Sequence, residues 1–165
     1  MSGDGMPIEG MARRLAAGGV TAIALLAGAC AGLDEIAARR ETALGARAFD
    51  GRATLEARID GHAATLPAAT AACANCHLPS ARPAEPGGAT PASGTLGPLL
   101  DRDRLTERLV RRGGPPSRFD ERSFCRLLRT GEDPTGVLLP RAMPRYDIDD
   151  AGCRQLWRHV TRPAA

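Results

Sequence analysis

The apolar positions of the chain fall into short helical patterns, separated by stretches rich in glycine and proline. Residues 33–46 carry apolar side chains at loosely helical spacing, and Gly45 is the expected end of that helix. Residues 47–59 then alternate partly between apolar and polar positions around an Asp-Gly pair at 50–51. This alternation predicts a small β-hairpin. The helix and the hairpin together form a predicted N-terminal extension over residues 32–65.

The second half of the chain carries three further helical patterns. The first covers residues 101–112 and is broken by the Gly-Gly-Pro-Pro run that follows it. The second covers residues 120–129, with Gly131 as its expected end. The third begins after the acidic N-cap at Asp149 and runs through Trp157. These patterns predict a mostly α-helical fold.

The first 31 residues have the pattern of an export signal. Arg13 and Arg14 precede an apolar run over residues 15–29, and small residues follow it. That run is shorter than the roughly 20 residues that a membrane-spanning helix needs. Residues 1–31 are therefore predicted to be a signal peptide or an N-terminal anchor. Cys30 leaves lipidation open, although Ala27 stands where a lipoprotein signal usually has leucine.

Composition restricts the class of protein further. Aromatic residues make up only 3% of the 165 residues, which is a small supply for a hydrophobic core. The net charge of +3 is modest, and we predict no nucleic-acid binding. No nucleophile, general base or phosphate-binding loop is recognisable, so catalysis by side chains is not predicted. A solvated helix face or a docking surface for an acidic partner would explain the local excess of arginines, which are Arg108, Arg111, Arg112, Arg118, Arg122, Arg126 and Arg129.

One motif carries recognisable chemistry. Cys73, Cys76 and His77 form the sequence C-x-x-C-H, which is typical of covalent c-type haem attachment. Two thiols on one helical turn can reach the two vinyl groups of a porphyrin, and the adjoining imidazole can ligate the iron. The helical start predicted over residues 67–72 would lead into this turn. A redox dithiol would require a βαβ context, and a zinc site would require a second pair of ligands. Neither is visible.

A second pattern lies before the terminal helix, where Met143 and Pro144 occupy a loop. With the C-x-x-C-H motif and the helix that follows, this Met-Pro loop resembles the class I c-type cytochromes over roughly residues 66–160. The resemblance implies a small cytochrome c-like domain, predicted here over residues 66–163, around one covalent haem c. It also implies that the iron is held by His77 and by the thioether of Met143, a ligand pair that raises the reduction potential.

The sequence allows more than one role for several residues. The resemblance implies that the carbonyl of Pro98 accepts a hydrogen bond from the His77 imidazole, whereas Pro98 could simply end a loop. Met143 could instead fill a gap in the core. His62 and His159 are alternative axial ligands, although a loop position and a surface position are expected for them.

Cys125 and Cys153 remain outside the haem motif, and each lies in a predicted helix. An exported protein meets an oxidising compartment, so we predict a disulfide between them, with two buried free thiols as the alternative.

The predicted function is one-electron transfer in the periplasm by a His/Met-ligated haem c, with a membrane tether at the N-terminus left open. The expected partners are redox proteins, namely a dehydrogenase, an oxidase or another cytochrome. Two alternatives remain. The chain could be the haem subunit of a dehydrogenase or oxidase complex, or a haem enzyme or gas sensor with an open iron site.

Overall fold

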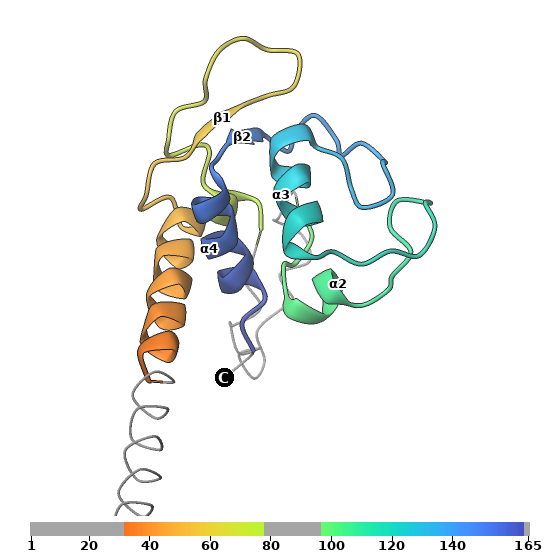
Figure 1. The fold of residues 1–165 in the computed structure, drawn as a ribbon. Coiled ribbons are helices and arrows are strands. Elements are labelled where there is room, and N and C mark those ends of the chain that lie inside the picture. The colour runs from red at the N-terminus through yellow and green to blue at the C-terminus, as the bar shows by residue number, and fades with distance from the viewer. Residues whose placement is uncertain (1–31, 78–96, 164–165) are drawn as a thin grey trace, which may run out of the picture. The chain divides into compact units, whose positions relative to one another are not determined.

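The computed structural model describes residues 32–77 and 97–163 (Figure 1). Residues 32–49 are helical, and a two-stranded antiparallel sheet pairs β1 with β2. The mostly helical class predicted from the sequence is therefore observed. The remaining elements, in chain order, are β1 (Glu56–Arg58), the 3-10 turn η1 (Cys73–Asn75), α2 (Arg102–Thr106), α3 (Glu121–Thr130), β2 (Arg145–Asp147) and α4 (Asp150–Val160).

Residues before Arg40 and those from Arg40 onward form two separate compact units. In the first unit, residues 32–39 are helical, and Glu35 and Arg39 form an exposed ion pair of 2.6 Å. The predicted leader and Cys30 lie outside the described residues. Within 32–77 and 97–163, no helix is long and apolar enough to cross a membrane.

The first helix does not end at Gly45, as the sequence predicted, but continues to residue 49. A β-carbon at Gly45 would collide with the backbone carbonyl of Gln155 in α4. Glycine therefore allows two helices to approach closely here, and α4 lies between residues 40–49 and α3 (Figure 1). Phe49 is only 1% exposed and belongs to the same hydrophobic core as residues of α3 and α4.

The predicted hairpin over residues 47–59 is wrong. Residues 47–49 belong to the first helix, and Gly51 follows it with a positive φ of 73°. The alternating segment does form a strand, but β1 pairs with the distant β2, with Ala57 opposite Tyr146. Alternation predicts one buried strand face and does not identify the partner strand.

The helix predicted over residues 101–112 is also shorter than expected, because α2 ends at Thr106. The chain then reverses, and Leu109 pairs with Ser117 as an isolated bridge. The guanidinium of Arg111 donates hydrogen bonds to backbone carbonyls of this non-helical segment. They include the carbonyl of Leu109 at 3.1 Å and that of Ser117. The Cζ of Arg111 also lies 5.1 Å from the centre of the Phe119 ring.

The helices α3 and α4 agree closely with the sequence patterns, and their ends carry local signals. Asp120 caps α3 in a reciprocal capping box, and Gly131 ends it with a φ of 78°. Asp149 caps α4 by accepting a hydrogen bond from the backbone of Gly152 at 2.7 Å.

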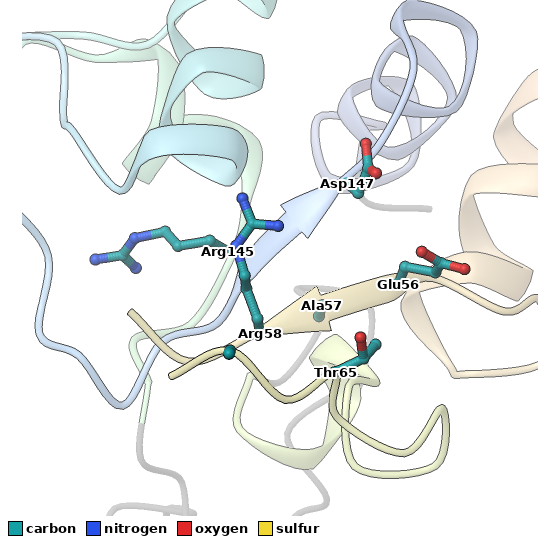
Figure 2. A pocket seen from close by; sticks show the side chains of 7 residues that line it. Glu56, Ala57, Arg58, Thr65, Arg145 and Asp147 are labelled. Atoms are coloured by element: carbon teal, nitrogen blue, oxygen red, sulfur yellow. The ribbon is translucent and has the colours of Figure 1, made fainter. Parts of the chain in front are cut away.

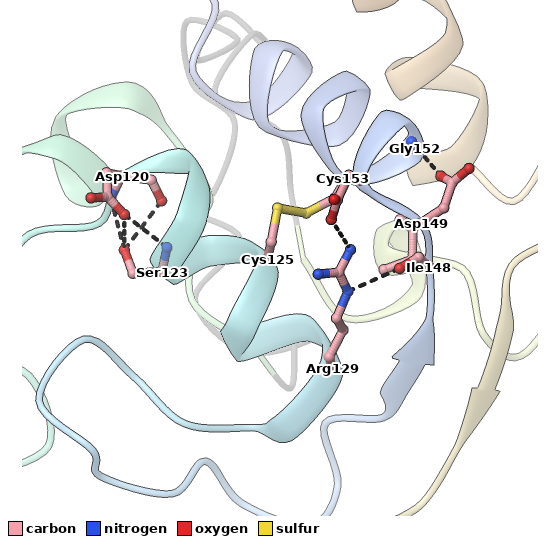
Figure 3. The surroundings of a disulfide bond; sticks show 9 residues. Asp120, Ser123, Cys125, Arg129, Ile148, Asp149, Gly152 and Cys153 are labelled. Carbon is pink, nitrogen blue, oxygen red and sulfur yellow. Dashed lines mark hydrogen bonds and ion pairs between the residues drawn. A yellow bond between two sulfur atoms is a disulfide. The ribbon is translucent and has the colours of Figure 1, made fainter.

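A disulfide between Cys125 and Cys153 joins α3 to α4, with a Cα–Cα distance of 5.7 Å (Figure 3). Both cysteines are buried. Arg129 adds a second connection between the helices through Ile148 and Asp150, at 2.9 and 2.7 Å. A disulfide of this kind typically contributes about 2–4 kcal/mol by restricting the unfolded chain.

His159 is buried at 5% exposure, and the surface position expected for it is wrong. Its ring packs on Phe49 with a centroid distance of 5.2 Å, and Arg162 donates a hydrogen bond to it. Burial, reinforced by the charge of Arg162, lowers the pKa of His159 to about 4. The side chain is therefore neutral at pH 7 and serves as a core residue.

This burial predicts an acid-sensitive fold. Because the pKa of His159 is lower in the folded protein than its ordinary value of 6.5, the unfolded chain binds more protons between the two values. We expect about 3 kcal/mol of stability to be present above pH 6.5 and lost as pH falls towards 4. Urea denaturation across this range should show the loss in the wild type and in a His62→Phe control. The loss of stability should be smaller in His159→Phe. An unchanged dependence of stability on pH in that variant would contradict the role given to His159.

Candidate functional site

Cys73, Cys76 and His77 lie on one tight turn at the end of a series of short turns. The segment before it, residues 67–72, forms turns instead of the predicted start of an α-helix. The backbone N–H groups of Cys76 and His77 both donate to the carbonyl of Cys73, at 3.1 and 2.8 Å. The Asn75 side chain donates to the Ala69 carbonyl at 2.7 Å. The turn therefore presents two thiols and an imidazole within five consecutive residues.

The two thiols of the motif are free and half-buried. Burial raises the pKa of the Cys73 thiol to about 11, despite a contact of 3.9 Å with the Tyr146 hydroxyl. Redox dithiols of the thioredoxin type need the opposite, a lowered pKa that populates the thiolate. The environment of Cys73 therefore disfavours the redox dithiol alternative.

The His77 imidazole is buried and held in one orientation. Its Nδ1 lies 2.7 Å from the carbonyl oxygen of Pro98. A carbonyl can only accept a hydrogen bond, so Nδ1 carries the proton and the lone pair of Nε2 is left available. Gly97 packs directly on the ring, where a β-carbon would overlap it, and the Gly97 N–H donates to the Cys76 carbonyl at 3.0 Å. The structure thus brings Pro98 to His77, as the resemblance implied.

All four residues expected to hold the haem, Cys73, Cys76, His77 and Met143, line one cavity of about 720 Å³. This volume is within the range of roughly 300–1,000 Å³ that is usual for ligand and cofactor sites. Met143 is half-buried, and its N–H donates to the Pro140 carbonyl at 3.1 Å. Most of the remaining wall is apolar and includes Phe49, Ile59, Leu66, Leu99, Leu100, Leu105, Leu109, Val110, Phe119, Phe124, Leu127, Leu128, Leu139, Leu156 and Val160.

A polar section of the cavity wall was not identified from the sequence. It contains Asp133, which is only 1% exposed, and Arg111. One carboxylate oxygen of Asp133 accepts hydrogen bonds from Thr135 and Val137, whereas the other is buried without a partner. Burial alone would raise the pKa of Asp133, but these hydrogen bonds and the charge of Arg111 lower it below its usual value. The only sequence signal was the turn composition Asp-Pro-Thr-Gly at 133–136.

The arginines considered as a docking surface are not a uniform set of free side chains. Arg108 and Arg126 donate to the carbonyls of Pro116 and Asp133, at 3.3 and 3.1 Å. Arg111 and Arg129 also have partners within the domain, as described above. Much of the predicted positive surface therefore stabilises loops and helix ends.

The other candidate ligands do not join the cavity. His62 is exposed and follows a turn, and His159 packs in the core behind Phe49 and is not itself among the residues that line the cavity. Among the described residues, no three histidine, cysteine, aspartate or glutamate side chains are grouped so that they could hold a metal ion. No family model, curated protein or solved structure matches this chain.

Proposed function

We propose that this protein is an exported one-electron carrier of the class I c-type cytochrome kind, with one haem c bound covalently to Cys73 and Cys76. The observation that carries this proposal is the shared cavity. Cys73, Cys76 and His77 are distant in the chain from Pro98 and Met143, yet all five line one largely apolar space of about 720 Å³.

The residues present fit such a cofactor. Two free thiols on one turn suit thioether bonds, and the Pro98 carbonyl leaves the Nε2 of His77 free to ligate iron. The thioether of Met143 would be the sixth ligand. When bound, haem c supplies an iron that accepts and donates single electrons.

The protein's own contribution is orientation and exclusion of water. Pro98 and Gly97 hold the imidazole, and the apolar wall provides a low-dielectric environment. A neutral sulfur ligand opposite imidazole favours the reduced iron and raises the potential. If His77 and Met143 both held the iron, the site would suit electron transfer rather than substrate chemistry.

We further propose that the protein works in the periplasm and exchanges electrons with a dehydrogenase, an oxidase or another cytochrome. The apolar run and the small residues of the leader support export. The disulfide between Cys125 and Cys153 is consistent with an oxidising compartment. A tether to the membrane, through an uncleaved leader or a lipid on Cys30, would keep the carrier near membrane-bound partners.

A spectrum of the reduced protein, produced with haem-attachment machinery and recorded before and after addition of carbon monoxide, tests the proposal. We expect covalent haem, a six-coordinate spectrum and no rapid response to CO. The Cys73→Ser/Cys76→Ser variant should lose the covalent bond while its disulfide stays intact. Rapid CO binding by the wild type would favour a haem enzyme or sensor instead, and the absence of covalent haem would overturn the proposal.

One observation favours a haem subunit of a larger complex as the second candidate. Leu109 and Val110 line the cavity, yet they are 37% and 68% exposed. Apolar side chains exposed at the edge of a redox site are suited to contact with a partner protein. Stable co-purification with a dehydrogenase or oxidase, lost in Val110→Asp, would support this candidate.

A further inference from the structure

Arg145 occupies an unusual position beside the candidate sixth ligand. It is the first residue of β2, two residues after Met143, and its side chain is only 6% exposed. Figure 2 shows this side chain running away from the strand pair that carries Glu56 and Asp147. Its Nη1 donates to the carbonyl of Met143 at 2.6 Å, and its Nη2 donates to that of Leu139 at 3.4 Å. One guanidinium therefore contacts both ends of the loop 139–143.

The surrounding residues are shaped around this guanidinium. Gly131, the C-cap of α3, has no side chain, and a β-carbon there would overlap the guanidinium of Arg145. The N–H of Leu139 donates to the Gly131 carbonyl at 2.8 Å, which places the loop against the end of α3. The C-terminal end of a helix carries a partial negative charge, so it favours a cation at this position.

No carboxylate among the described residues lies within ion-pair distance of Arg145. Its Nε is buried without a hydrogen-bond partner, and its neighbour across the sheet is another arginine, Arg58. Glu56 and Asp147 line a small pocket of about 60 Å³ together with Arg145, but neither pairs with it (Figure 2). Burying a charge without an opposite charge is costly. A well-packed apolar residue is often at least as favourable for stability, so packing alone does not explain an arginine here.

We propose that Arg145 is a positioning residue for Met143, and that its buried charge favours the reduced state of the iron. This inference rests on the proposed function. The planar guanidinium fork holds the two carbonyls and so restricts the loop that carries the thioether. Groups that orient a metal ligand from outside the coordination sphere commonly change metal-site properties by about 10–100-fold when they are removed.

The chain offers a matched control. Arg141 precedes Met143 by two residues, as Arg145 follows it by two, but Arg141 is exposed. We therefore compare haem-loaded wild type, Arg145→Met and Arg141→Met, each with covalent haem verified by mass spectrometry. Arg145→Met should raise the CO affinity of the reduced protein by about tenfold. It should also lower the reduction potential by about 59 mV, which corresponds to a tenfold shift in a one-electron equilibrium. Arg141→Met should match the wild type in both.

If Arg145→Met does not accumulate as folded protein, Arg145→Lys serves as the second variant. It keeps the charge but lacks the planar fork, so CO affinity should still rise while the potential falls less than in the methionine variant. Equal CO affinities and potentials in the Arg145 and Arg141 variants, in a wild type that is itself insensitive to CO, would overturn this inference alone. A wild type that binds CO rapidly or lacks covalent haem would overturn the proposed function as well.

Discussion

Replacing Met143 with alanine in the haem-loaded protein should increase the apparent CO affinity of the reduced iron by about 100-fold. In the wild type, CO must compete with the thioether, so it binds only the small fraction of molecules in which the sulfur has left. Apparent affinity falls in proportion to that fraction, and a minor state at about 1% gives a factor of about 100. The measurement is a CO titration of the reduced protein, followed by its visible spectrum.

Leu139→Ala is the matched control for Met143→Ala. Leu139 lines the same cavity and belongs to the same loop, but it has no atom that can ligate iron. It should therefore remain insensitive to CO, although both variants lose apolar packing. If Met143→Ala left CO affinity almost unchanged, Met143 would be a core residue, and the iron site would already be open as in a haem enzyme or sensor.

Substituting Gly97 with alanine should disturb the other axial side. The new β-carbon would overlap the Cε1, Nδ1 and Nε2 atoms of the His77 ring. The ring must then move and lose its 2.7 Å contact with the Pro98 carbonyl. Overpacking of a buried contact costs about 1–3 kcal/mol, and we expect that loss in urea denaturation of the haem-loaded protein. A changed visible spectrum should accompany it, because His77 is the proposed proximal ligand.

Pro98→Ala is the control for Gly97→Ala. It changes the neighbouring residue of the same loop without the steric effect on the His77 ring. Pro98 is exposed, and its contribution to His77 is a backbone carbonyl that alanine also has. The Pro98 variant should keep the wild-type spectrum. Wild-type stability and an unchanged spectrum in Gly97→Ala would show that the ring has room to accommodate a methyl group, contrary to the packing described here.

Some elements could be predicted from the sequence because their signals are local. The helix α3 lies between a capping box at Asp120 and a left-handed glycine at Gly131, and α4 follows the N-cap Asp149. Each signal acts within one turn of the chain, so it needs no knowledge of the rest of the fold. The C-x-x-C-H motif is equally local.

Other predictions failed where a distant segment decided the outcome. Gly45 was expected to end the first helix, but the helix continues through it, and the missing side chain instead leaves room for the backbone carbonyl of Gln155. The strand at Glu56–Arg58 was expected in a hairpin, yet it pairs with a strand that begins at Arg145. His159 was expected at the surface, yet Phe49 from another helix buries it.

The sequence by itself determined the chemistry available to this protein: two thiols, an adjoining imidazole and a single methionine after residue 31. It also determined both ends of α3 and the start of α4, because capping depends on neighbours in the chain. Only the tertiary structure decided that Met143 and His77 share one cavity, that Asp133 enters its wall and that Arg145 holds the methionine loop. The physical reason is that these contacts depend on packing between segments far apart in sequence, and neither periodicity nor spacing encodes which segments meet.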